Sequence, residues 1–234
     1  MRTGSGSAPS ATWGPSRRLV ARLLVFDLDG TLVDSSRDLA AATNAALRRV
    51  APDEPPIPVE KVCTFVGNGA RVLVERTLDH AGIDRAVDEV LPIFLECYEL
   101  CLLDTTRPYP GVAEALGALD GPPCAVLTNK PGPLARRILD GLDLASRFAR
   151  IWGAGDVPER KPDPRGLERL IGELGATPEE TWMIGDSPVD VRTARAAGVR
   201  VAGVSWGLAP EGLRRESPDR LIDDARELVA LADE

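Results

Sequence analysis

The sequence predicts an α/β fold: a doubly wound, Rossmann-like parallel sheet with an all-helical cap domain inserted into it. Three observations support this. Short apolar runs alternate with helical periodicities along most of the chain, an order typical of parallel sheets covered on both faces. Polar residues directly follow several apolar runs, at the strand ends where such sheets bind ligands. Between residues 34 and 106 nothing resembles a strand, so a wholly helical unit interrupts the alternation.

These patterns set the expected domain boundaries. Residues 1–18 are rich in Gly, Ser, Pro and Ala without periodicity, and we expect a disordered tail there. Residues 19–33 and 107–234 are assigned to the catalytic core, and residues 34–106 to the helical cap. A chain of 234 residues is long enough for a core with a smaller inserted domain.

The first predicted strand is the apolar run Leu23–Phe26, which runs into Asp-Leu-Asp-Gly-Thr. Ser35 or Ser36 is expected to cap the helix that follows, and the Pro-rich residues 51–58 end that helix. Amphipathic or short apolar patterns predict the helices of the cap at residues 37–50, 59–65, 71–80 and 84–103.

The remaining core elements follow a Pro- and Gly-containing return linker, residues 107–111, and a helix after it. Asp163 is expected to cap one helix, with Pro164 at its first position. Apolar runs predict strands at residues 123–130, 149–153, 181–186 and 199–204. Helical patterns predict helices at residues 133–142 and 164–174, another between the strand at 181–186 and residue 197, and a last one at 222–232.

Composition limits the classes of partner. The chain has 28 basic and 36 acidic residues, a net charge of −8, so it is a poor general binder of nucleic acid or of anionic membranes. No apolar run approaches the ~18 residues of a membrane span. The four Cys show no zinc or disulfide spacing, which favours buried thiols and a cytoplasmic location. We expect a monomer or homodimer.

Asp27 and Asp29 follow the first strand one residue apart. Neighbouring carboxylates raise each other's pKa unless a cation lies between them, and hard oxygen ligands favour Mg²⁺. Asp27 begins the turn and is the candidate nucleophile, because an ionised carboxylate can attack phosphorus without a base. Asp29 is the candidate acid and base for the leaving oxygen. Gly30 allows close approach of the backbone to a ligand.

Further polar residues stand at the later strand ends. The Thr128 hydroxyl is a candidate hydrogen-bond donor to a phosphoryl group, and Asn129 beside it is a candidate substrate contact, although the pair also suits an ordinary turn. Lys161 is either a fixed charge that offsets carboxylate–phosphate repulsion or a solvated loop lysine. Asp186 is either the partner of Asp27 in a magnesium site or part of a helix cap, and Asp190 either orients Lys161 or the metal water or is a charge on a helix face.

Four segments together resemble the haloacid-dehalogenase superfamily of phosphatases: Asp-Leu-Asp-Gly-Thr, Thr-Asn-Lys-Pro, Lys-Pro-Asp-Pro and Gly-Asp-Ser-x-x-Asp. The resemblance covers roughly residues 19–207, and the helical insertion stands where that family has its mobile cap. The second carboxylate, Asp29, argues against the dehalogenases themselves. Residues 66–71 of the cap, together with Thr-Asn-Lys-Pro and residues 204–207 of the core, look most like phosphoglycolate phosphatases. Residues 208–212 depart from the family's small polar loop.

The resemblance implies a mechanism. Mg²⁺ is expected on Asp27, Asp186 and the Asp29 carbonyl, with an aspartyl-phosphate on Asp27 and proton transfer by Asp29. It implies a small phosphorylated metabolite, 2-phosphoglycolate, as the substrate. Its non-phosphate end is expected to meet cap residues Gly67, Asn68, Gly69 and Arg71, although this stretch also suits a helix–helix turn. The alternatives are a phosphatase of a sugar phosphate or pyrophosphate, a phosphosugar mutase with the same machinery, or a catalytically idle binding protein.

Overall fold

The computed structural model describes residues 21–234, so the expected tail at residues 1–18 lies outside the described residues. At the centre is a six-stranded sheet whose paired strands all run parallel, in the order β5-β4-β1-β6-β7-β8. The predicted doubly wound α/β fold is therefore confirmed. The strands are β1 (Leu23–Phe26), β4 (Cys124–Pro131), β5 (Arg150–Ala154), β6 (Thr181–Gly185), β7 (Arg200–Val204) and β8 (Arg220–Ile222).

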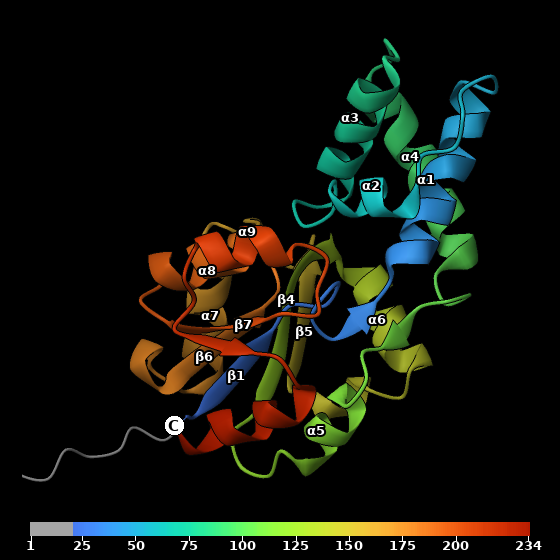
Figure 1. Ribbon diagram of the computed structural model, residues 1–234. Coiled ribbons are helices and arrows are strands. Elements are labelled where there is room, and N and C mark those ends of the chain that lie inside the picture. Colours follow the sequence, from blue (N-terminus) through green and yellow to red (C-terminus); the bar gives the residue numbers. More distant parts are fainter. Residues whose placement is uncertain (1–20) are drawn as a thin grey trace, which may run out of the picture.

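Helices cover both faces of the sheet (Figure 1). Successive side chains of a strand point to opposite faces, so Leu24 and Phe26 of β1 pack into one apolar cluster and Leu23 and Val25 into another. The first face is covered by α5 (Val112–Ala118), α6 (Gly132–Gly141) and the 3₁₀ helix η3 (Ala225–Asp233); the second by α7 (Arg165–Leu174), α8 (Pro188–Ala196) and α9 (Pro210–Arg215). The short 3₁₀ helices η1 (Ala145–Arg147) and η2 (Pro178–Glu180) precede β5 and β6.

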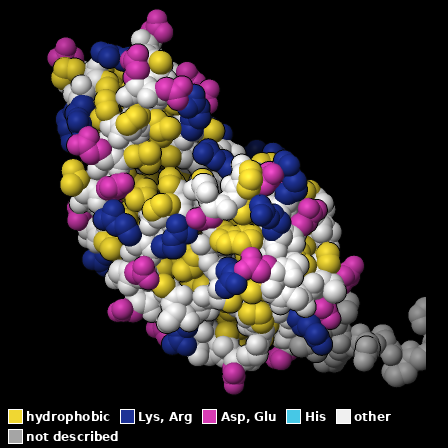
Figure 2. Space-filling view, turned by 180° about the vertical axis from the view of Figure 1, so that it is seen from behind, with side chains coloured by type: hydrophobic (Ala, Val, Ile, Leu, Met, Phe, Trp, Pro, Cys, Tyr) yellow, Lys and Arg dark blue, Asp and Glu magenta, His cyan; other side chains and the backbone are white. Residues whose placement is uncertain are grey.

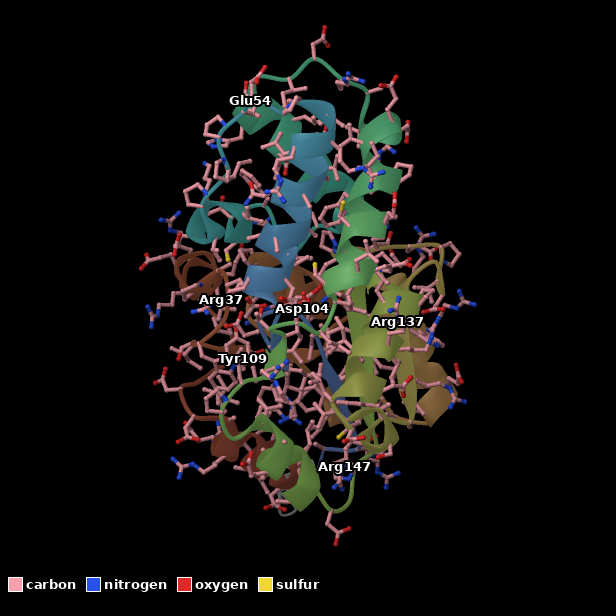
Figure 3. All side chains as sticks on the ribbon, turned by 90° about the vertical axis from the view of Figure 1, so that its right-hand side faces the viewer. Arg37, Glu54, Asp104, Tyr109, Arg137 and Arg147 are labelled. Atoms are coloured by element: carbon pink, nitrogen blue, oxygen red, sulfur yellow. The ribbon has the colours of Figure 1, made fainter. Side chains whose placement is uncertain are left out.

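Four helices, which we call the helical insertion (residues 36–101), stand over the carboxyl ends of the strands (Figure 1). Its fully buried Phe94 and Tyr98 stack on each other, and the apolar cluster they join continues into the first face of the sheet. Figure 3 shows Glu54 at the far end of the insertion and Asp104 at its junction with the core. The helices are α1 (Ser36–Val50), α2 (Val59–Cys63), α3 (Ala70–Ala81) and α4 (Val87–Cys101).

A second, two-stranded sheet joins the insertion to the core. Strand β2 (Val33–Asp34) enters the insertion and β3 (Arg107–Pro108) leaves it, and the two pair antiparallel. Both passages of the chain therefore run side by side. The segment expected to be a plain return linker, residues 107–111, contributes one of these strands, which is too short to produce a pattern in the sequence.

The structure differs from the expected elements in three places. The predicted last helix at residues 222–232 is the 3₁₀ helix η3, which begins at Ala225, and the short strand β8 before it was not predicted. Helix α9 was not predicted, because its six residues include one buried apolar side chain, Leu213. Helix α7 begins one residue later than expected, with Pro164 before its first residue, although the Asp163 carboxylate still accepts the Arg165 N–H at 3.0 Å.

Figure 2 shows basic and acidic side chains interspersed on one face of the molecule, together with a group of hydrophobic side chains on the helical insertion. Neither sign of charge is concentrated there, in keeping with the mixed composition. Within residues 21–234, every helix is too short or too polar to cross a lipid bilayer.

Candidate active site

Three neighbouring strands bring their polar ends to the same edge of the sheet. Strand β1 lies between β4 and β6, and the carboxyl ends of these strands lie beneath the helical insertion (Figure 1). Asp27 follows β1, Thr128 lies near the end of β4, and Asp186 follows β6. Because strand order reverses at β1, this edge has the crevice in which doubly wound sheets hold ligands. All three side chains are buried.

Asp27 is buried beside a single cation. Its Oδ1 lies 2.9 Å from Lys161 Nζ as an ion pair, but no donor is aligned to make a hydrogen bond to this oxygen. Burial raises the pKa of Asp27 to about 6, against the lowering effect of Lys161 and with a further rise from Asp190. A buried carboxylate oxygen without a hydrogen-bond donor is suited to receiving a cation or a reacting atom.

Asp186 is held by a loop that comes from far along the chain. Its Oδ2 accepts the Leu208 backbone N–H at 2.7 Å, and Thr31 Oγ1 lies 3.4 Å from Oδ1. Burial, followed by the charges of Asp190 and Asp27, raises its pKa well above the usual range. Residues 31 and 208 were not predicted as contacts, because nothing in the sequence indicates which distant loop covers a strand end.

Lys161 lies between two carboxylates. Its Nζ donates to Asp190 Oδ1 at 2.6 Å and faces Asp27. Burial lowers the pKa of Lys161, but Asp190 and Asp27 more than offset this and raise it, so the amine stays charged. The other oxygen of Asp190 accepts from Ser187 N and Oγ, at 3.1 and 2.6 Å. Both oxygens of Asp190 are therefore engaged, and its hydrogen bond to Lys161 is what an orienting role toward that lysine requires.

The carboxylates form a set suited to a hard divalent cation. Oxygens of Asp27, Asp186 and Asp190 lie within 4.8 Å of one another, and all three residues are buried. Three carboxylates share one lysine, so the cluster carries excess negative charge in a place of low dielectric. Oxygen donors with surplus negative charge fit Mg²⁺. Because Asp190 is already engaged, Asp27 and Asp186 are the side chains that fit such an ion.

The Asp29 side chain points away from this cluster into a second set of contacts. It accepts from Ser35 Oγ at 2.5 Å and from Lys130 Nζ at 2.9 and 3.0 Å. Ser35 precedes α1, but its side chain makes no cap hydrogen bond there, unlike the expected cap. No role for Lys130 was predicted from the sequence, where it stands within the segment Thr-Asn-Lys-Pro. A lysine inside a predicted apolar strand is the signal that could have marked it as a candidate site residue.

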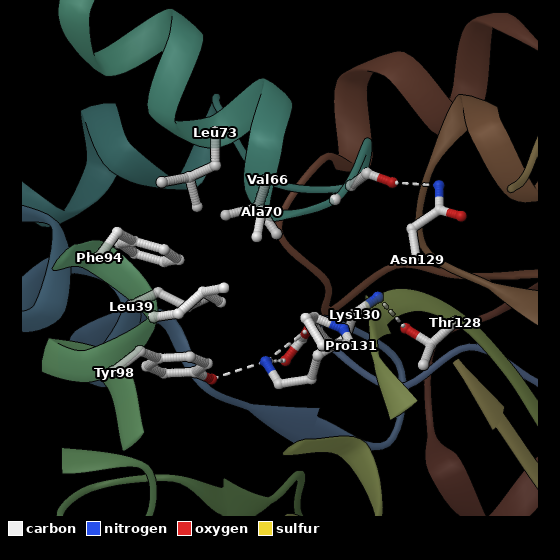
Figure 4. A pocket seen from close by; sticks show the side chains of 14 residues that line it. Leu39, Val66, Ala70, Leu73, Phe94, Tyr98, Thr128, Asn129, Lys130 and Pro131 are labelled. Carbon is white, nitrogen blue, oxygen red and sulfur yellow. Dashed lines mark hydrogen bonds and ion pairs between the residues drawn. The ribbon is translucent and has the colours of Figure 1, made fainter. Parts of the chain in front are cut away.

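A small pocket lies between the helical insertion and the end of β4 (Figure 4). Its free volume is about 40 Å³, and Asp29 and Lys130 are the charged residues that line it. Most of its wall is apolar. The residues that line it are Asp29, Leu39, Val66, Gly67, Gly69, Ala70, Leu73, Phe94, Leu95, Tyr98, Thr128, Asn129, Lys130 and Pro131.

Asn129 and Thr128 lie where the sequence placed them, at the end of β4. The Asn129 amide donates to the carbonyls of Gly67 and Lys161, at 3.0 and 2.9 Å, so it ties the insertion to the core. Thr128 Oγ1 accepts the Lys130 N–H at 3.3 Å, which leaves its own proton available. Their roles toward a substrate stay predictions.

The structure brings Gly67 and Gly69 into the pocket wall but not Asn68 or Arg71. Asn68 Oδ1 accepts from Arg76 at 2.9 Å, within the insertion. Arg71 forms an exposed ion pair with Asp88 of α4, because the first turn of α3 faces α4 at that position. Substrate contacts by Asn68 and Arg71 were predicted; in this arrangement their side chains are engaged elsewhere.

A family model, two relatives and a solved structure resemble this chain over most of its length. A family model described as haloacid dehalogenase-like hydrolase matches residues 21–198. The phosphoglycolate phosphatase of Pseudomonas putida is 40% identical over 216 residues, covering 89% of this chain and 78% of the relative. Phosphoglycolate phosphatase 1 of Pseudomonas aeruginosa is 40% identical over 224 residues, covering 91% and 80%. A crystal structure of a predicted phosphoglycolate phosphatase from Haemophilus somnus superposes with a TM-score of 0.86 at 33% identity, covering 91% and 98% of the two chains.

Proposed function

Because the chain belongs to the haloacid dehalogenase-like hydrolases, we propose that it is a magnesium-dependent phosphatase that hydrolyses 2-phosphoglycolate to glycolate and phosphate. Hydrolysis of a phosphoric monoester is supported by the names of relatives 40% identical over most of the chain. The substrate, the metal and a covalent intermediate on Asp27 are the parts of the proposal that need experiments.

The observation that carries the proposal is the state of Asp27. It is buried, pairs with Lys161, has one oxygen without a hydrogen-bond donor, and lies beside Asp186. A structural carboxylate in this position would have its oxygens satisfied by donors, as Asp190 does. An unsatisfied carboxylate next to a cation is suited to bind metal and to attack an electrophile.

In the proposed mechanism, an Asp27 oxygen attacks the phosphorus atom, and the bond from phosphorus to the leaving oxygen breaks. Asp29 in its protonated form gives its proton to that oxygen, so the alcohol leaves, a phosphoryl group remains on Asp27, and Asp29 becomes ionised. Asp29 then takes a proton from a water molecule, which attacks the same phosphorus atom and releases phosphate. Lys161 and Thr128 stabilise the negative charge on the phosphoryl oxygens. Asp27, Asp186 and the Asp29 carbonyl would hold Mg²⁺, which supplies further positive charge there.

We propose that the helical insertion is a cap domain. The pocket beside Asp29 is closed on one side by insertion residues and on the other by the end of β4 (Figure 4). A substrate seated on Asp27 would therefore direct its leaving group toward the insertion. A cap over this pocket excludes bulk water and restricts the size of the leaving group.

The test is release of phosphate from a panel of phosphorylated metabolites that includes 2-phosphoglycolate, sugar phosphates and pyrophosphate, with Mg²⁺ and after exhaustive chelation. We expect 2-phosphoglycolate to give the highest kcat/KM, and chelation to abolish it. Asp27→Asn should lower turnover by roughly three orders of magnitude or more with the fold retained, because the attacking oxygen is lost. Mass spectrometry of the variant checks for deamidation back to Asp.

Two outcomes would contradict the proposal. Full turnover without metal would show that the reaction needs no magnesium site. An Asp27→Asn variant that retains several per cent of activity without deamidation would show that Asp27 is not the nucleophile. Absence of turnover on every compound would favour the idle binding protein that the sequence left open.

A further inference from the structure

Lys130 has no role in the phosphate-directed machinery, yet it is buried. The chain has three lysines, and Lys130 and Lys161 are both buried while Lys61 is exposed. Lys161 serves Asp27 and Asp190. Lys130 points the other way, into the pocket beside Asp29 (Figure 4). A charged amine is rarely kept away from water unless partners satisfy it, so its partners indicate what it is for.

Those partners are one anion and one neutral group. Lys130 Nζ lies 2.9 and 3.0 Å from the two Asp29 oxygens and 2.6 Å from the hydroxyl of Tyr98, which comes from α4. It also lies 4.4 Å from the centre of the Tyr98 ring. An ammonium group has three donors, and a carboxylate is a stronger acceptor for one of them than a phenol. An anion that enters the pocket can therefore replace the Tyr98 hydroxyl while Asp29 stays held.

The rest of the pocket provides no other charge for a ligand. Among the described residues that line it, Lys130 is the one cation and Asp29 the one anion. The remaining wall is mostly aliphatic and aromatic, from Leu39, Leu73 and Phe94 among others. The free space within this wall is small, about 40 Å³, which favours a short leaving group.

We propose that Lys130 determines specificity by binding a negative charge on the leaving group, so that the enzyme selects short leaving groups bearing a carboxylate. This inference rests on the proposed phosphatase function and goes beyond it by assigning the selective contact to the end of β4. The contact predicted from the sequence, Arg71, is engaged on the outer surface with Asp88. A neutral leaving group would be desolvated by the apolar wall without an ionic contact to Lys130, and a cationic one would be repelled by the Lys130 ammonium, whose partner Asp29 is already engaged, so both should react more slowly.

The first experiment compares three substrates of matched length on the wild-type protein: 2-phosphoglycolate, 2-hydroxyethyl phosphate and 2-aminoethyl phosphate. All three lose a two-carbon primary alkoxide, and they differ in whether the far end is anionic, neutral or cationic. We expect kcat/KM to fall by roughly ten- to a hundredfold from the first to the second, the size of a lost charge-assisted hydrogen bond, and further for the third.

The second experiment repeats the comparison with Lys130→Met, which keeps the length of the side chain and removes the charge. The ratio of kcat/KM for 2-phosphoglycolate to that for 2-hydroxyethyl phosphate should fall about tenfold or more. Lys61→Met is the matched control, since Lys61 is an exposed lysine of α2, and its ratio should equal that of the wild type. If Lys130→Met is not folded, Lys130→Gln, which retains donors to Asp29 and Tyr98, replaces it.

The ratio of the two kcat/KM values distinguishes substrate selection by Lys130 from a purely structural role in holding Asp29. If Lys130 merely held Asp29 in place, both substrates would slow in parallel and the ratio would stay at the wild-type value, which would overturn the inference. Equal turnover of the three substrates by the wild-type protein would also overturn it while leaving the phosphatase function intact. A wild-type protein that hydrolyses none of them would refute the proposed function and this inference together.

Discussion

Asp186 is positioned by glycines as much as by hydrogen bonds. Gly30 has a φ of +86°, and a Cβ atom built there would lie 2.3 Å from Asp186 Oδ2. A Cβ atom on Gly207 would lie 2.1 Å from the Cβ atom of Asp186. Both distances are far below van der Waals contact, so a side chain at either position must push Asp186 or the backbone away. The glycines thus fix where one carboxylate of the candidate metal site lies.

We predict that Gly207→Ala weakens metal binding. The added methyl group displaces Asp186, and loss of support for a metal ligand typically costs ten- to a hundredfold in affinity, so the Mg²⁺ concentration for half-maximal activity should rise at least about tenfold. The measurement is a magnesium titration of phosphatase activity.

Gly117→Ala is the matched control. Gly117 lies within helix α5, and the nearest atom to an added Cβ would be Arg147 Nη2 at 3.8 Å, an ordinary contact. This variant should keep the wild-type titration and gain about 0.5–1 kcal/mol in stability from its helix propensity. A Gly207→Ala titration that matches the wild type would show that Asp186 is not a ligand or is free to adjust.

At the base of the helical insertion, one buried carboxylate joins the two passages of the chain. Asp38, in the first turn of α1, accepts the backbone N–H and hydroxyl of both Thr105 and Thr106, at 2.5–3.0 Å. These threonines directly precede β3, so Asp38 joins the chain that enters the insertion to the chain that leaves it. Burial favours the neutral form of Asp38, but these hydrogen bonds outweigh it and lower its pKa below the usual 3.8.

We predict that Asp38→Asn lowers the free energy of unfolding by about 2–3 kcal/mol at neutral pH, because the amide cannot accept from four donors. The folded-state pKa of Asp38 is lowered, so its stabilisation is present above the unfolded value of about 3.8 and is lost as pH falls through the folded value. The difference between wild type and variant should therefore be constant from pH 7 to 5 and shrink in more acidic solution. Denaturant unfolding at several pH values measures it.

Asp104 provides the control for this series. It is exposed at the same junction (Figure 3), so Asp104→Asn should change stability by less than about 0.5 kcal/mol. If Asp38→Asn were equally mild, the junction would be held by the β2–β3 pair and not by Asp38.

At the scale of the whole molecule, the features that depend on local sequence pattern were predicted correctly, namely the parallel sheet and the polar ends of its strands. Alternating apolar runs and helices predicted the parallel sheet, and the polar strand ends led to Asp27, Asp186 and Lys161, which the structure brings together. Contacts made across the chain were not predictable in this way. Leu208 N reaches Asp186 and Tyr98 reaches Lys130 because of how loops and the insertion dock, and neither leaves a periodic or spacing signal.

The elements that were not predicted illustrate the same limit. Strand β8 has three residues at the edge of the sheet, one of them buried, so its apolar pattern is too short to identify a strand. The segment before it, α9, is short and charged. The directions of side chains in α3 were similarly undetermined: a polar, Gly-flanked stretch suggested a substrate contact for Arg71, whereas the rotation of the helix turns that residue toward Asp88.

The most direct test of the account is to trap the phosphoryl group on Asp27. The protein is mixed with 2-phosphoglycolate and Mg²⁺, quenched in acid within the first turnover, digested and analysed by mass spectrometry. We predict a phosphorylated peptide containing Asp27 that forms before free phosphate, decays as turnover proceeds, and is absent from Asp27→Asn. Turnover without any phosphorylated peptide, or with the phosphoryl group on another residue, would contradict the assignment of Asp27 as the nucleophile.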